Sequence, residues 1–124
     1  MLNLILLYLA SFFLVFWGIA HLFPTRSVIA EFGEIKIENQ RIVAMEWINE
    51  GATLIFMGIL IAAITYVDHT NTVSKTVYRL SFLMLNALSV ISLFTGFKIS
   101  FLPYKLCPVI FSGASVLIML GLYL

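Results

Sequence analysis

Four long apolar stretches, separated by short polar segments, make up most of the chain. The first covers residues 2–23 and contains no Asp, Glu, Lys or Arg, and the others cover 40–67, 75–97 and 108–124. A helix of roughly 20 residues crosses an apolar layer about 30 Å thick, so each stretch is suited to one membrane span. The pattern predicts an all-α fold, a four-transmembrane-helix bundle that forms a single integral membrane domain over residues 1–124.

The polar segment between the first two spans differs from a simple loop. Charged residues such as Arg26 and Glu31 alternate there with apolar ones, and Val28, Ile29 and Phe32 fit one face of a helical turn. Mixed charge with regularly placed apolar residues is typical of a segment that lies along a membrane surface. We therefore expect a short interfacial helix followed by an irregular stretch.

Small and polar residues form stripes along the first two spans. Ser11, Gly18 and His21 recur at helical spacing on the first, and Gly51 and Gly58 recur on the second. Small residues allow transmembrane helices to approach closely. We expect both stripes to face other helices of the bundle.

Three residues predict local details of the helices. Asn39 is suited to the N-cap of the second span, and Pro108 is suited to the first turn of the fourth, where its missing N–H has no cost. Asn86 falls near the middle of the third span, where an unpaired amide would be unfavourable. We expect Asn86 to hydrogen-bond to another helix.

The composition supports the membrane assignment and excludes several functions. The chain is 62% hydrophobic and 10% charged, with a mean hydropathy of +1.09, and a soluble domain of 124 residues has no interior large enough for so much apolar surface. The lipid bilayer is thus the expected surrounding. A net charge of +1 gives no basic surface for nucleic acid. Cys107 is the one cysteine, so neither a disulfide within the chain nor a C-x-x-C pair is possible.

Two carboxylates interrupt the second span and are the main candidate for function. Glu46 and Glu50 are four residues apart, so they share one helix face, and Asn49 lies beside them. Like charges at this spacing repel each other, and in a low-dielectric setting they require a cation, a shared proton or hydrogen-bond donors. This turn is therefore the predicted centre of a site.

The four-span topology places further residues at the same membrane face, here named side A and defined by the loops 24–39 and 98–107. We expect a pocket there with these ligand-binding candidates: His21, Trp17, Trp47, Glu46, Asn49, Glu50 and Lys98. We do not expect a metal site, because the E-x-x-H spacing of carboxylate-bridged metal centres is absent. The residues identify no cofactor and no catalytic group.

A structural role for the carboxylates is the interpretation that the sequence favours. Buried acids in small bundles are often paired with basic residues that fix helix register, and Arg26, Arg41 and Lys98 are the available partners on side A. A ligand or proton site is the alternative, and the sequence leaves both open.

Basic residues are more frequent on side A than on the opposite face. Five Lys or Arg residues belong to side A and two to the other face, so the positive-inside rule predicts that loops 24–39 and 98–107 are cytoplasmic. We expect a multi-pass protein of a bacterial inner membrane.

Two stretches resemble the DoxX-like group of small four-helix membrane proteins. Residues 17–24, Trp-Gly-Ile-Ala-His-Leu-Phe-Pro, are similar to the Gly-x-x-(His/Lys)-Leu ending of that group's first helix. The second helix of the group commonly opens with a Glu followed by small residues and leucines, as Glu46, Gly51 and Leu54 do here. The resemblance implies a link to quinone-coupled or other redox processes, with Glu46 or Glu50 as the shared acid.

Three classes of function remain open at this stage. The first is a membrane-embedded binding or accessory protein that holds a lipophilic small molecule, a proton or a partner helix, as a homo-oligomer or beside a membrane partner subunit. The second is a small proton-coupled transporter that resembles the small multidrug resistance proteins, although those place their essential Glu in helix one. The third is an enzyme acting on a lipophilic substrate, with Glu50 or His21 as general acid/base and Lys98 stabilising developing charge.

Overall fold

The computed structural model describes residues 1–124 and is helical almost throughout, without strands. Four of its helices are long and apolar enough to cross a membrane, which confirms the predicted four-span, all-α fold. The elements in chain order are α1 (Leu2–Leu22), α2 (Thr25–Ala30), α3 (Ile37–Asp68), α4 (Thr72–Phe94), the 3₁₀ turn η1 (Gly96–Lys98) and α5 (Leu102–Tyr123). The short α2 and the turn after it match the expected helix and irregular stretch between the first two spans.

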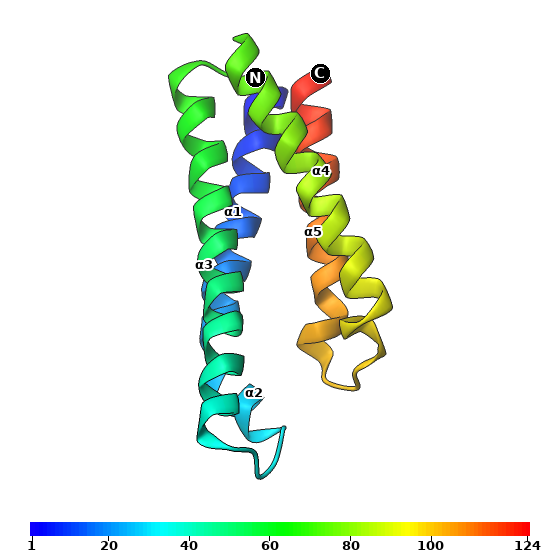
Figure 1. The fold of residues 1–124 in the computed structure, drawn as a ribbon. Helices are drawn as coiled ribbons and strands as arrows, with labels where there is room; N and C mark the ends of the chain where they lie inside the picture. The colour runs from blue at the N-terminus through cyan, green and yellow to red at the C-terminus, as the bar shows by residue number, and fades with distance from the viewer.

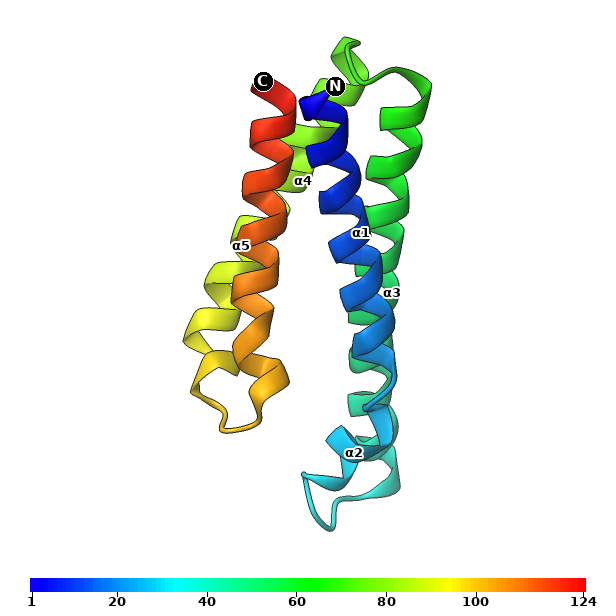
Figure 2. The same cartoon turned by 180° about the vertical axis from the view of Figure 1, so that it is seen from behind.

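The long helices form two antiparallel pairs (Figure 1). Helix α1 packs along α3, α4 packs along α5, and α1 also contacts α5, whereas α3 and α4 contact each other little. Seen from either side, the two pairs diverge toward the end that carries α2 (Figure 2). Both chain termini and the α3–α4 turn lie at the opposite end.

Glycines hold α1 and α3 close together. A Cβ atom on Gly18 would lie 2.7 Å from the backbone oxygen of Gly51, and one on Gly58 would lie 2.8 Å from the backbone oxygen of Ser11. No side chain fits at these two positions without moving the backbone of the neighbouring helix. Each stripe therefore faces another helix, as predicted, and the structure shows that the two stripes face each other, with Ser11 donating a hydrogen bond of 2.7 Å to the carbonyl of Gly58.

Two helices begin earlier than the sequence pattern predicts. Helix α3 starts at Ile37, so the prediction that Asn39 is an N-cap is wrong, and Glu38 lies in the first turn, where the helix dipole favours an acid. Helix α4 starts before residue 75 because the side chain of Asn71 accepts a hydrogen bond of 3.0 Å from the amide of Ser74.

Helix α5 also extends further than expected, beginning at Leu102 rather than at residue 108. Pro103 occupies the first turn, and Pro108 lies inside the helix, so its predicted first-turn position is wrong. Because proline has no N–H, the usual hydrogen bond from residue 108 to the carbonyl of Tyr104 cannot form. The consequence is a backbone acceptor without its helical partner at the side A end of α5.

Polar side chains at depth are satisfied mainly within their own helices. Asn86 donates a hydrogen bond of 2.8 Å to the carbonyl of Phe82, so the expected partner on another helix is replaced by the preceding turn of α4. Near the end where the pairs converge, the hydroxyls of Thr65 and Tyr78 are 2.8 Å apart and link α3 to α4.

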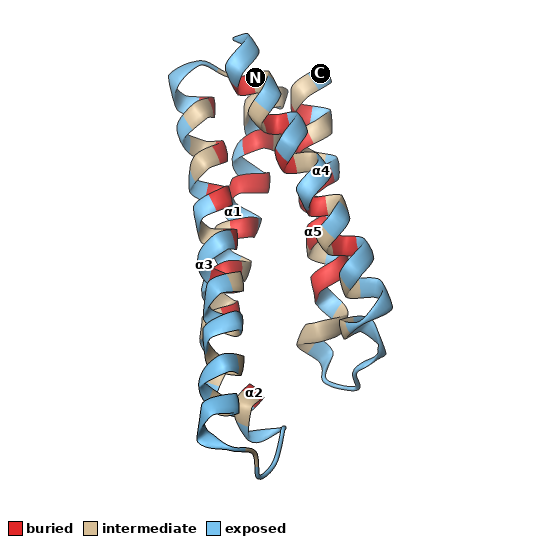
Figure 3. Ribbon diagram, viewed as in Figure 1, coloured by how far each residue is buried: buried red, intermediate tan, exposed pale blue.

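Buried residues form a thin seam between the helices, and the outer faces are exposed and apolar (Figure 3). Only 25 of the 124 residues are buried, while large apolar side chains such as Phe12, Phe56, Leu80 and Val90 point outward. So much exposed apolar surface is unfavourable in water and favourable against lipid chains. The architecture is compatible with an integral multi-pass membrane protein.

Candidate functional site

The last turn of α1 meets the middle of α3 at one pair of polar side chains. His21 is 6% exposed, and its Nε2 lies 3.4 Å from Oε2 of Glu50. This distance is within ion-pair range, but Nε2 has no partner in hydrogen-bonding geometry. The close approach at Gly18 and Gly51 brings the two together, because Gly18 precedes His21 by about one turn and Gly51 follows Glu50.

An aromatic residue of α3 fixes the imidazole in place. The rings of Trp47 and His21 are stacked, with centroids 3.8 Å apart and planes inclined by 15°. The indole Nε1 of Trp47 donates a hydrogen bond of 2.6 Å to the backbone carbonyl of His21. Tyr104, from the start of α5, meets Trp47 edge-on at 5.5 Å. His21 is therefore held by the ring of Trp47, and Tyr104 of α5 packs against Trp47 in turn.

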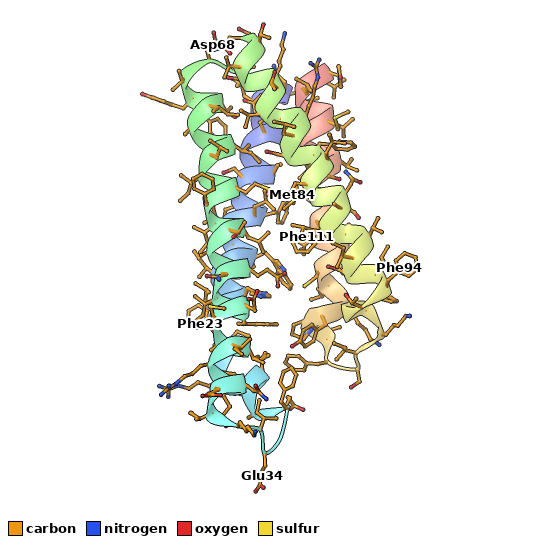
Figure 4. The ribbon with its side chains drawn as sticks, in the orientation of Figure 1. Phe23, Glu34, Asp68, Met84, Phe94 and Phe111 are labelled. Atoms are coloured by element: carbon orange, nitrogen blue, oxygen red, sulfur yellow. The ribbon has the colours of Figure 1, made fainter.

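Two adjoining cavities meet at this cluster. The larger, of about 620 Å³, lies between α3 and α4, with α2 and the α4–α5 connection closing one end. The smaller, of about 400 Å³, lies between α1, the side A end of α4 and α5. Residues that line both cavities are Trp47, Glu50, Leu88, Ile99 and Tyr104. In the stick view, side chains from both helix pairs project into the intervening space, with Met84 and Phe111 near its middle and Asp68 and Glu34 marking opposite ends of the molecule (Figure 4).

The lining of the larger cavity is mostly apolar with an acidic edge. Ten of its 14 lining residues are hydrophobic, and its charged groups are the carboxylates of Glu46 and Glu50. No Lys or Arg lines either cavity. Glu50 is partly exposed, with 41% of its side-chain surface accessible, so the carboxylate reaches the cavity while its other side faces His21. The arrangement can hold an apolar molecule with one polar group.

The structure brings only some of the predicted site residues into one cluster. His21 contacts both Trp47 and Glu50, and Glu46 and Asn49 line the larger cavity from exposed positions on α3. Trp17 lies behind the cluster against a third space of about 170 Å³, and its Nε1 has no hydrogen-bond partner. Lys98 is exposed and lines neither of the two main cavities.

The expected pairing of the acids with basic side chains does not occur. The one ion pair in the structure joins His21 to Glu50, and neither acid pairs with Arg26, Arg41 or Lys98. Pairing with Lys or Arg therefore does not explain the two carboxylates, and the pair of Glu50 with His21 leaves Glu46 without an ionic partner.

Sequence reasoning missed most of the residues opposite the acids. Met84 and Leu88 of α4 and Thr53 of α3 line the larger cavity, yet in the sequence they belong to spans where inward and lipid-facing residues are equally apolar. The place of Tyr104 was indicated by the sequence, because its position beside Pro103 in the side A loop puts it near the same membrane face as the two acids.

No group of three or more His, Cys, Asp or Glu side chains is arranged to hold a metal ion. Comparison of the chain with protein-family models, curated proteins and solved structures gives no match.

Proposed function

We propose that the protein is a membrane-embedded binding protein for a small lipophilic molecule. The apolar part of this molecule lies between α3 and α4, and its polar group meets Glu50. The observation that carries the proposal is the larger cavity, which has a partly exposed carboxylate at its edge and apolar walls elsewhere. Its volume of about 620 Å³ lies in the range typical of small-molecule sites.

The position of the cavity supports entry from the bilayer. Met84 and Ile42, on opposite walls, are both exposed, so the cavity opens outward between α3 and α4. A lipophilic molecule dissolved in the surrounding lipid reaches such an opening without passing through water. A carboxylate at this depth is unfavourable by itself, and a bound polar group compensates part of that cost.

The orientation and wider role follow from the sequence alone and are part of the same proposal. The excess of basic residues on side A places the loops 24–39 and 98–107 in the cytoplasm, for a protein of a bacterial inner membrane. The DoxX-like resemblance suggests an accessory role in a redox process, with a homo-oligomer or a membrane partner subunit as the working assembly.

Native mass spectrometry of the protein released in mild detergent tests the proposal. We expect wild-type protein to carry a co-purified small molecule and the Glu50→Gln variant to lose most of it. Glu46→Gln is the matched comparison. It makes the same chemical change on the same helix face, at a residue that does not pair with His21. Equal retention in both variants, or bare protein in all three samples, would contradict the proposal.

A further inference from the structure

We propose that the polar group held at Glu50 is a cationic nitrogen, so that the ligand is a lipophilic amine or ammonium compound. This inference rests on the proposed function and adds the chemical class of the ligand.

The charges around the two cavities favour a cation. Both carry acidic side chains, Glu50 in each and Glu46 in the larger, and neither is lined by Lys or Arg. An anionic head group would face like charges without any compensating cation. A neutral head group would add no positive charge beside the carboxylate of Glu50, which has largely apolar surroundings and no Lys or Arg in either cavity lining.

The imidazole of His21 does not satisfy this carboxylate. His21 is buried, and its Nε2 points toward Glu50 at 3.4 Å without forming a hydrogen bond. Because this approach is outside hydrogen-bonding geometry, the carboxylate keeps acceptor positions free for a donor from a ligand. An ammonium N–H supplies such a donor and, at the same time, the missing positive charge.

The backbone carbonyl of Tyr104 also lacks its usual helical hydrogen-bond donor. Pro108 cannot donate to the carbonyl of Tyr104, and this oxygen lies 3.5 Å from the position of a Cβ on Gly96. Gly96 and Tyr104 both line the smaller cavity, beside Glu50. The carboxylate of Glu50 is thus accompanied by a backbone carbonyl that lacks its usual helical donor, and both groups accept hydrogen bonds.

Aromatic rings complete the surroundings of the head group. Trp47 and Tyr104 line both cavities, and their edge-to-face contact at 5.5 Å places two π systems next to the carboxylate. Aromatic faces attract ammonium groups, most strongly where water is excluded. Beyond the rings, Leu54, Met84 and Leu88 give an apolar wall for a hydrocarbon tail.

Three probes with the same tail and different head charges test the inference. Decylammonium (protonated decylamine), decanol and decanoate are titrated by calorimetry into protein in phosphatidylcholine nanodiscs, and empty nanodiscs give the partition background. We expect saturable binding of the cation, roughly tenfold tighter than that of decanol, and no saturable binding of decanoate. Glu50→Gln should remove the preference for the cation, whereas Glu38→Gln, the same change at an exposed residue of α3 that lines neither cavity, should leave it unchanged.

The negative outcomes distinguish a failure of the cationic inference from a failure of the proposed binding function. If decanol binds to wild-type protein as tightly as the cation, the cavity takes neutral molecules such as quinones, and the cationic inference is wrong while the binding function stands. If decanoate binds best, the inference is also wrong. If no probe binds above the nanodisc background, the binding function itself is contradicted.

Discussion

Helix α3 has two long sides that are built in opposite ways. Toward α1 it presents glycines, and the two backbones approach until the Cβ position of Gly18 is 2.7 Å from the carbonyl of Gly51. Toward α4 it presents Thr53, Leu54 and the two acids, and a cavity of about 620 Å³ remains between the helices. The tight side positions the imidazole and the carboxylate, and the open side leaves the carboxylate accessible. One helix thus combines a rigid support with a binding surface.

The largest effect is expected from a substitution that opens the tight side. Gly18→Ala places a methyl group against the backbone of α3, so we expect a loss of about 1–3 kcal/mol in the free energy of unfolding, measured in mixed detergent and SDS micelles. The same change should separate His21 from Glu50 and weaken binding of decylammonium.

Gly113→Ala is the matched control for this substitution. It adds the same methyl group to a helix at a position with nothing within 4 Å, so stability should be unchanged or slightly higher. Equal stability of the Gly18→Ala and Gly113→Ala proteins would show that the α1–α3 contact is not the tight support described here.

A smaller effect is expected at Trp47, which stacks on His21 and also lines both cavities. Trp47→Phe keeps an aromatic ring beside His21 but removes the hydrogen bond of 2.6 Å to its carbonyl, which should cost about 1 kcal/mol of unfolding free energy. Looser positioning of His21 should also reduce affinity for decylammonium. Trp17→Phe removes an indole N–H that has no acceptor, and should affect stability less. Equal losses in the two variants would argue against the proposed role of Trp47.

The smallest effect is expected at the end of the molecule where Thr65 of α3 meets Tyr78 of α4. Tyr78→Phe removes the hydroxyl that meets Thr65 at 2.8 Å and keeps the buried ring, so the expected loss is about 0.6 kcal/mol, a typical interhelical hydrogen bond in a membrane protein. A double-mutant cycle with Thr65→Val measures the coupling between the two side chains directly. A coupling energy of zero would mean that packing alone holds α3 to α4 at this end.

The sequence predicts the tight side of α3 better than the open side. Glycine and serine stripes have a distinct spacing, and close packing of small residues is their usual role in membranes, so Gly18, Gly51 and Gly58 were placed correctly. Helix ends were less predictable, because caps such as Asn71 act through local hydrogen bonds that hydrophobic periodicity does not reveal.

The open side was predicted only where it is polar. Glu50 and His21 stand out in apolar spans, and a shared membrane face was enough to bring them together. Met84 and Leu88 carry no such signal, since a residue that lines an apolar cavity and one that faces lipid meet the same chemistry. The position of Lys98, which lies away from both cavities, depends on the path of the short 3₁₀ turn rather than on its place along the chain.

Photolabelling tests the central claim, that the space between α3 and α4 is a binding cavity, most directly. A decyl amphiphile with a diazirine at the tail end and either a hydroxyl or an ammonium head is irradiated with the nanodisc protein, and labelled residues are identified by peptide mass spectrometry. We predict saturable labelling of Leu54, Met84 and Leu88 that excess unlabelled probe abolishes, and only non-saturable labelling of outward-facing residues such as Phe12 and Phe16. Labelling that is non-saturable everywhere and no stronger on α3 and α4 than on the outer face of α1 would contradict the claim.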